Sequence, residues 1–288
     1  MPELPEVEVV KKSLEKEINN FTIKNVKIID GNLRYKVKKQ DINKIIGLKI
    51  KKIKRRSKYL IFFLSKKFAM IVHLGMTGKF FLIKKNKFKK KTSFYYKIED
   101  SSDKHDRLVF ILKKNLKLVY NDVRKFGFIK IFKLNKIKEV DHLKILGPEP
   151  LSYLYNFQYF KDYLIGKNRK IKDLLMDQKF VSGLGNIYVN EILFLSEIRP
   201  DRKIIKLKDF EIKKVIKNTK KVLKKAIIFG GSSIKNFSNS GGKKGNFQQH
   251  FKVYGKAGLR CSTSGCFEMI RKIVISNRSS LFCSKCQK

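Results

Sequence analysis

Two groups of residues, at opposite ends of the chain, have the types and spacing needed for chemistry. At the start, Pro2 becomes a free secondary amine if Met1 is removed, and the carboxylate of Glu3 lies directly beside it. An amine nucleophile next to an acid/base group is the minimum requirement for Schiff-base catalysis. Near the end, four cysteines form two pairs of the kind that bind a metal. We therefore expect an enzyme that uses its own N-terminus as the nucleophile.

The amine must be neutral to attack an electrophile at physiological pH. A lysine side chain, with a pKa of about 10.4, is almost wholly protonated, whereas an α-amino group has a pKa of about 7.7–8.0. Proline is more basic, so burial and a nearby positive charge would have to lower the pKa of its amine. Taken alone, Pro2 and Pro5 could also simply begin a helix, with Glu3 and Glu6 at its positive end.

The spacing of the cysteines predicts a structural zinc site. Cys261 and Cys266 bracket four residues, Cys283 and Cys286 bracket two, and sixteen residues separate the pairs. Two knuckles that each present two thiolates satisfy tetrahedral zinc, which leaves no open coordination position for catalysis. We expect one structural Zn²⁺ and no catalytic metal. Free cysteines or a disulfide are the alternatives, and the reducing cytosol disfavours a disulfide.

The charge of the chain favours a polyanionic partner. Lys and Arg number 68 against 24 Asp and Glu, a formal net charge of +44. Lysines that neutralise phosphates would give strongly salt-dependent binding to nucleic acid. Lysine, isoleucine and asparagine also crowd every region of the sequence, which a genome biased toward A and T could produce without selection for binding.

Length and hydropathy indicate a folded two-domain protein outside the membrane. A chain of 288 residues can hold two cores, and a hydrophobic content of 42% argues against disorder. No apolar run approaches the roughly 18 residues of a membrane span, and no signal peptide opens the chain. We expect a monomer in the cytosol or nucleoid.

The first half of the chain predicts one helix followed by a β-sandwich or barrel. Apolar residues at helical spacing indicate a helix over 6–18. Short β-branched and aromatic segments separated by turns or charge runs then indicate strands. These strands are expected over 21–29, 48–54, 59–64, 69–73, 79–83, 108–112, 116–121 and 128–132.

The second half is predicted to be mainly helical. Helices are expected over 155–165, 170–176, 187–196 and 208–229, after a linker over 135–150 that ends Gly147-Pro148-Glu149-Pro150. A stretch rich in Gly, Ser and Asn over 230–246 is predicted to be a loop. The cysteines follow, among short strand-like segments.

The chain resembles a known family along its whole length. The opening Pro2-Glu3-Leu4-Pro5-Glu6-Val7-Glu8 closely resembles that of the bacterial formamidopyrimidine-DNA glycosylases, which remove oxidised purines. Further matching segments follow in the same order. They are Arg55-Arg56-Ser57-Lys58-Tyr59, His73-Leu74-Gly75-Met76-Thr77-Gly78, Asp122-Val123-Arg124-Lys125-Phe126-Gly127, Leu146-Gly147-Pro148-Glu149-Pro150-Leu151, Gly185-Asn186-Ile187-Tyr188 and the cysteine region.

The resemblance implies an α+β fold of two domains. An N-terminal helix with a β-sandwich forms a catalytic domain over 1–134, and the linker over 135–150 follows. A helical domain with a helix–two-turn–helix element spans 151–238. A lesion-capping loop and a zinc-ribbon hairpin complete the chain over 239–288. DNA would lie in a cleft between the two domains.

The resemblance also implies the reaction, base-excision repair by a bifunctional glycosylase and abasic-site lyase. Pro2 would be the nucleophile, Glu3 the general acid/base, Glu6 a supporting carboxylate, and Lys58 a phosphate or elimination contact. Capture of the sugar as an imine acidifies the neighbouring proton, so β,δ-elimination can cut the strand. The substrates would be 8-oxoguanine and formamidopyrimidines in double-stranded DNA.

The target base is buried in the duplex and must be flipped out. By resemblance Met76, Arg124 and Phe126 would fill the void, with Arg124 contacting the orphaned cytosine. Contacts to the DNA backbone would come, besides Lys58, from His105, Asn186, Tyr254 and Arg278. The stretch 239–249 resembles the loop that closes over the extruded base, and the alternative is a disordered linker.

Two other functions compete with this interpretation. An endonuclease VIII-like glycosylase for oxidised pyrimidines usually has Gly where this chain has Leu4, and it differs at the void-filling positions. A non-catalytic zinc-ribbon DNA-binding protein would leave Pro2, Glu3 and Lys58 unexplained.

Overall fold

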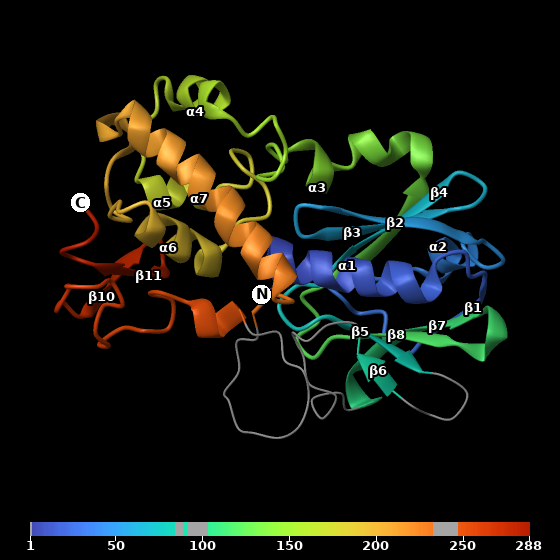
Figure 1. Cartoon of the computed structure of the whole chain (residues 1–288). Helices are drawn as coiled ribbons and strands as arrows, with labels where there is room; N and C mark the ends of the chain where they lie inside the picture. The colour runs from blue at the N-terminus through green and yellow to red at the C-terminus, as the bar shows by residue number, and fades with distance from the viewer. Residues whose placement is uncertain (1, 84–88, 92–102, 233–246) are drawn as a thin grey trace. The chain divides into compact units, whose positions relative to one another are not determined.

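The computed structural model of the chain describes residues 2–83, 89–91, 103–232 and 247–288. These residues form two compact units, each with its own elements (Figure 1). The first unit holds the described residues up to Lys144 together with 229–232, and the second holds 145–228 and 247–288.

The first unit begins with helix α1, Leu4–Ile18. Its apolar positions Val7, Val10 and Leu14 recur every three or four residues, so they share one face of the helix and are buried there. This face packs on strands β2 and β3, beside which the helix runs in Figure 1. The packing fixes the start of α1, where Pro2 and Glu3 lie.

Two antiparallel sheets make up the rest of this unit. The first has the order β1-β7-β8-β5-β6 and the second β2-β3-β4-β9. The strands are β1 Ile23–Ile28, β2 Ile50–Arg56, β3 Tyr59–Leu64, β4 Phe68–His73, β5 Lys79–Ile83, β6 Lys89–Lys91, β7 Asp106–Leu112, β8 Lys117–Asn121 and β9 Phe128–Lys133. Two short helices, α2 Lys39–Asn43 and α3 Asp141–Lys144, also belong to this unit.

The two sheets and α1 enclose one hydrophobic core. Phe62 from the second sheet meets Phe80 from the first with ring centroids 6.1 Å apart. On its other side the second sheet carries a smaller cluster around Ile61, Ile71 and Phe128. The central strands β3 and β4 are therefore buried on both faces, which explains why they read as nearly continuous apolar runs.

The second unit is helical and ends in a two-stranded hairpin. Its elements are α4 Phe157–Leu164, α5 Ile171–Met176, α6 Asn186–Leu195, α7 Asp209–Ile228, β10 Ile270–Ile275 and β11 Arg278–Cys283. Helix α6 is apolar around most of its circumference and is buried from Ile187 to Phe194, with α5 and α7 packed against it. It also contacts β11, so α6 supports the hairpin.

The α+β class and the sandwich predicted from the sequence are confirmed, and predicted ends agree within about two residues. Strand β6 was not expected, because its residues are three lysines in a charged run. The segment 135–150, predicted to be a linker, contains most of a 3₁₀ helix, Leu134–Glu139, and all of α3. Among the described residues, no helix combines the length and the hydropathy needed to span a bilayer.

Candidate active site and nucleic-acid interface

The register of the two sheets gathers the candidate residues of the first unit at one end of the sandwich. In the second sheet, Tyr59 pairs with His73 and His73 pairs with Phe128. A candidate residue lies close in sequence to each of them: Lys58 to Tyr59, Met76 to His73, and Phe126 to Phe128. In the first sheet, Asn121 pairs with both Lys79 and Asp106, which brings the chain segments around Met76, His105 and Arg124 together.

Pro2, Glu3 and Glu6 form a buried group at the start of α1. Pro2 is buried, and the Glu3 and Glu6 side chains are 4% and 1% exposed. The backbone N–H of Glu3 donates to Oε2 of Glu6 over 2.9 Å. Glu6 is the third helical residue after the N-cap residue Glu3. Its carboxylate thus satisfies one of the N–H groups that have no partner within the helix itself. This hydrogen bond fixes the backbone that carries the Glu3 carboxylate and Pro2.

The second oxygen of Glu6 binds a distant segment of the same unit. Oε1 accepts from the backbone N–H of Ser232 over 2.8 Å and from its hydroxyl over 3.1 Å. Gly231 precedes it with a φ of +80°, and a Cβ there would press on the Glu6 side chain. Glycine is required at this position for both reasons. The role of Ser232 carries no signal in the sequence, because the contact spans 226 positions.

Lys58 lies in the two-residue turn between β2 and β3 and is 6% exposed. Ser57 before it has a φ of +55°, as tight hairpin turns require. Arg55 links this turn to α1, because its Nε lies 2.7 Å from Oε2 of Glu8 while its guanidinium donates to the carbonyl of Ser57 over 2.9 Å. The ion pair between Arg55 and Glu8 therefore fixes the turn that contains Lys58 relative to helix α1, at whose start Pro2 lies.

His73 ends β4 and lies among aromatic rings. Its ring centroid is 5.0 Å from that of Tyr59 and 5.6 Å from that of Phe128. Burial, together with the positive charges of Lys58 and Arg34, lowers the pKa of His73 to about 4. Nδ1 accepts the backbone N–H of Gly75 over 3.1 Å, which a neutral imidazole can do. His73 therefore orders the turn that follows it.

The three candidate void-filling residues lie in two exposed turns. Met76 is 39% exposed in the turn 74–78, and Phe126 is 47% exposed in the turn 122–127. The guanidinium carbon of Arg124 lies 4.6 Å from the centre of the Phe126 ring, a cation–π contact. Their exposure leaves the Met76 and Phe126 side chains accessible to a ligand. His105 is half-buried at the end of a 3₁₀ helix. Its backbone carbonyl oxygen accepts a hydrogen bond from the backbone N–H of Asp122 over 3.0 Å.

In the second unit, helix α6 presents Asn186 and organises the segment of Tyr254. Asn186 is the first residue of α6, after Gly185, where free N–H groups suit a phosphate. Deeper in the helix the buried Glu191 accepts backbone N–H groups from Lys252, Val253 and Tyr254 over 2.7–3.0 Å. Burial raises the pKa of Glu191, and these donors oppose that rise. Tyr254 is therefore fixed through a carboxylate that sequence reasoning missed.

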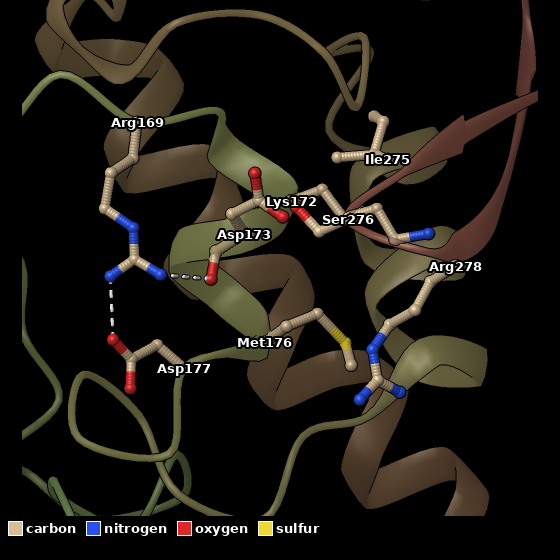
Figure 2. Close-up of a pocket in the computed structure, with 8 residues that line it drawn as sticks. All are labelled: Arg169, Lys172, Asp173, Met176, Asp177, Ile275, Ser276 and Arg278. Carbon is tan, nitrogen blue, oxygen red and sulfur yellow. Dashed lines mark hydrogen bonds and ion pairs between the residues drawn. The ribbon is translucent and has the colours of Figure 1, made fainter.

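Arg278 begins β11 and is exposed. Figure 2 shows it at a pocket of about 410 Å³ between α5 and the hairpin turn. Lys172 of α5 is 1% exposed and donates to the carbonyl of Ser279 and the hydroxyl of Ser280, each over 2.7 Å. Burial and the charge of Arg278 lower the pKa of Lys172 to about 8. Asn186 donates to the same carbonyl, so two helices hold the strand that presents Arg278.

The four cysteines converge at the hairpin. Their sulfur atoms all lie within 4.8 Å of one another, with Cys261 and Cys286 at 3.8 Å and Cys266 and Cys283 at 3.6 Å. Four sulfurs bound to zinc at about 2.3 Å in a tetrahedron lie about 3.8 Å apart. No disulfide joins them. The cluster therefore fits a tetrahedral metal ion.

One candidate element lies largely outside the described residues. Of the predicted capping stretch 239–249, the structure describes only 247–249, which belong to a 3₁₀ helix, Phe247–His250. Phe247 packs near Tyr188 of α6 with ring centroids 5.8 Å apart.

Comparison with known proteins shows which protein family has this sequence and this fold. Residues 1–129 match the formamidopyrimidine-DNA glycosylase N-terminal domain, and residues 146–238 match the formamidopyrimidine-DNA glycosylase H2TH domain. A formamidopyrimidine-DNA glycosylase of Rickettsia bellii (strain OSU 85-389) is 42% identical over the full length of both chains. That of Rickettsia massiliae (strain Mtu5) is 40% identical, over 100% of this chain and 97% of the relative.

Solved structures give the same result. The wild-type Lactococcus lactis Fpg (MutM) in complex with DNA that contains N7-benzyl-Fapy-dG is 34% identical, with a TM-score of 0.85 over the whole of both chains. The complex of Lactococcus lactis Fpg with DNA that contains an abasic site is 35% identical, with a TM-score of 0.85 over 99% of each chain.

Proposed function

The chain belongs to the formamidopyrimidine-DNA glycosylase family, and from this membership we propose how its own residues carry out repair. It is a base-excision repair glycosylase that acts on damaged DNA. We propose that its substrates are 8-oxoguanine and formamidopyrimidines, and that it is bifunctional, with an abasic-site lyase activity. The single observation that carries the mechanism is the buried Pro2–Glu3–Glu6 group at the start of α1.

In the proposed reaction the neutral amine of Pro2 attacks the anomeric carbon of the damaged nucleotide. The glycosidic bond breaks, and the base departs with the bonding electrons and a proton. Glu3 acts as general acid on the sugar ring oxygen and then as general base. Loss of the amine proton and opening of the ring, with the ring oxygen protonated, give an iminium ion because Pro2 is a secondary amine. Its positive charge acidifies the adjacent C–H of the sugar. Two eliminations then release the 3′ and 5′ phosphates. Glu6 supports Glu3 through its backbone N–H.

The remaining candidates are proposed to hold the DNA. Met76, Arg124 and Phe126 would fill the space that the flipped base leaves, and their exposure supports this. Phosphate contacts are proposed for Lys58, His105, Asn186, Tyr254 and Arg278. The hydrogen bonds that fix the backbone around Tyr254 and Arg278 support their part, because a contact that is already ordered costs less entropy on binding.

Zinc is proposed as the structural metal of the second unit. The residues that would hold it are Cys261, Cys266, Cys283 and Cys286, and the ion would cross-link the hairpin on which Arg278 is carried. We further propose that the protein works as a monomer in the bacterial cytosol or nucleoid. Its functional domains are proposed to have the limits expected from the sequence, except that residues 229–232 belong to the first compact unit.

Reductive trapping tests the proposed reaction. Sodium borohydride is added to the zinc-loaded protein and a duplex with 8-oxoguanine opposite cytosine, and the covalent adduct is mapped by peptide sequencing. An adduct on the amine of Pro2 is expected, and it also requires that Met1 has been removed. An adduct at another amine would exclude Pro2 as nucleophile. Trapping only on an oxidised pyrimidine would instead support the endonuclease VIII-like reading.

Substitution of Glu3 separates the two half-reactions. Glu3→Gln keeps the shape of the side chain but removes its acid/base function. We expect base excision to fall by about 100-fold or more, as general acid–base catalysis contributes. Trapping on DNA with a preformed abasic site should persist, because its aldehyde needs no leaving group. Equal loss of both activities would contradict the role assigned to Glu3.

A further inference from the structure

The two turns that carry the proposed void-filling residues share one hydrogen-bond system, which is centred on the buried Asp122. The hydroxyl of Thr77, in the Met76 turn, donates to Oδ1 of Asp122. It also accepts the backbone N–H of Arg124 over 3.0 Å. Oδ2 of Asp122 accepts the backbone N–H of Gly127 over 2.9 Å. Thr77 and Asp122 thus connect the first turn with both ends of the second.

Burial makes these hydrogen bonds selective for one arrangement. Asp122 and the neighbouring Tyr120 are both 0% exposed, and the Tyr120 hydroxyl lies 3.4 Å from Oδ2 of Asp122. A buried carboxylate oxygen that loses a donor remains desolvated and unpaired, which is costly. Separation of the turns would therefore leave buried oxygens of Asp122 without their donors.

Glycines bring the two backbones into direct contact. A Cβ on Gly75 would collide with the backbone of Phe126 and Gly127, and a Cβ on Gly127 would collide with the Tyr120 hydroxyl. A Cβ on Gly78 would meet the carbonyl of Leu74. The absence of side chains at these positions lets the first turn lie against the second.

A second set of contacts holds the Arg124 turn from its other side. Arg107, 6% exposed, donates to the carbonyl of Asp122 over 2.8 Å and to Asp30 over 2.9 Å. Lys125 lies 2.7 Å from the same oxygen of Asp30 and, as its hydrogen-bond partner, lowers the pKa of that carboxyl group. The backbone N–H of Arg34 donates to the carbonyl of Gly127 over 3.1 Å. The turn is therefore fixed along its length.

We propose that Thr77 and Asp122 are positioning residues that hold Met76, Arg124 and Phe126 as one preformed unit. The inference rests on the proposed function, in which these three side chains enter the duplex together. Thr77 is the residue on which the unit depends, because its single hydroxyl serves both turns. A unit ordered before DNA binds loses little conformational entropy on insertion, whereas two independent turns would each have to be ordered.

Two substitutions at Thr77 test the proposal. Thr77→Val keeps the shape but removes the hydroxyl, and Thr77→Ser keeps the hydroxyl. The readouts are kcat/KM for 8-oxoguanine opposite cytosine in a duplex, and cleavage of an abasic site in single-stranded DNA, which leaves no void to fill. For Thr77→Val we expect about a tenfold loss on the duplex, the effect of one lost hydrogen bond to a carboxylate, and wild-type cleavage of the single strand.

The Ser variant should stay within about twofold of the wild type on both substrates. The preference for cytosine over adenine opposite the lesion should also fall in Thr77→Val, because Arg124 loses a backbone partner. Equal losses on both substrates, no loss on the duplex, or a Ser variant as weak as the Val variant would each overturn the proposal. A wild-type protein inactive on both substrates would instead overturn the proposed function, and this inference with it.

Discussion

Glu6 joins two segments that are 226 positions apart in the chain, and each of its oxygens has a different task. One orders the backbone of Glu3 and the other binds Ser232. A carboxylate can do both only because it accepts on both oxygens, whereas an amide must turn its NH₂ toward one of the donors. The charge of Glu6 therefore matters for its geometry, apart from any part in proton transfer.

This reasoning predicts the effect of Glu6→Gln on stability. The amide NH₂ would face either the N–H of Glu3 or that of Ser232, so we expect the free energy of unfolding to fall by about 1–3 kcal/mol. Urea denaturation measures it. Glu139→Gln, at an exposed position, is the matched control and should change the value by less than about 0.5 kcal/mol. Equal stability of the Glu6 variant and the control would show that the buried contacts are not needed.

His73 gives a pH-dependent prediction. Its pKa is about 4 in the folded chain and about 6.5 when unfolded. Between these values the unfolded chain binds more protons, so stability rises with pH from about 4 to 6.5 and is level above that range. The contribution lost on acidification is at most about 3 kcal/mol.

An NMR titration would measure the protonation of His73 directly, with a His73→Gln variant to assign the signal. We expect no change in the imidazole signal from pH 8 to 5. A midpoint near 6.5 would show that the ring is solvated, and would contradict its packing against Tyr59 and Phe128.

At the scale of elements, the helices of the second unit act through backbone atoms of the loops and strands beside them. Glu191 of α6 binds three consecutive N–H groups, and Lys172 of α5 holds the start of β11. The β10–β11 hairpin is thus fixed at one end by helix side chains and at the other by its cysteines.

Removal of the metal should therefore loosen part of the second unit and spare the first. We expect a chelator to release one Zn²⁺ per chain and to increase amide hydrogen exchange in β10 and β11. Exchange in β2, β3 and β4 should stay the same. A colorimetric zinc assay and exchange mass spectrometry provide the measurements, and uniform exchange after chelation would contradict a local structural role.

The elements themselves could largely be predicted from the sequence. Strands β3 and β5 agree with the sequence expectation at both ends, because apolar runs bounded by turns specify them. Strand β6 could not be foreseen, since three lysines carry no apolar pattern and only pairing with β5 makes them a strand. Motif resemblance gave the candidate site, whereas Lys172, Glu191 and Ser232 depend on contacts between distant positions, which no local pattern reveals.

At the scale of the whole molecule, the net charge of +44 has two possible origins, DNA binding and genome composition. Only lysines and arginines that neutralise phosphates displace counterions, so the dependence of affinity on salt counts them. The proposed contacts contain few of the 68 basic residues. Most of the excess should therefore raise non-specific attraction without making fixed contacts.

We expect Arg278→Ala to reduce the slope of log affinity against log salt by about one. Lys24→Ala, at an exposed position of β1 without a proposed contact, should leave that slope unchanged. Fluorescence anisotropy with a duplex that carries a stable abasic analogue measures both variants. Equal slopes for the two variants would mean that the charge acts diffusely and that Arg278 makes no phosphate contact.

The close approach at Gly75, Gly78 and Gly127 has a genetic consequence. Every missense change in a glycine codon installs a residue with a Cβ, and at these three positions a Cβ meets backbone or a buried hydroxyl. No missense change in these three codons therefore preserves the contact between the turns. Random mutagenesis of the gene, scored by the mutation rate of the host, should recover only synonymous changes at these three codons.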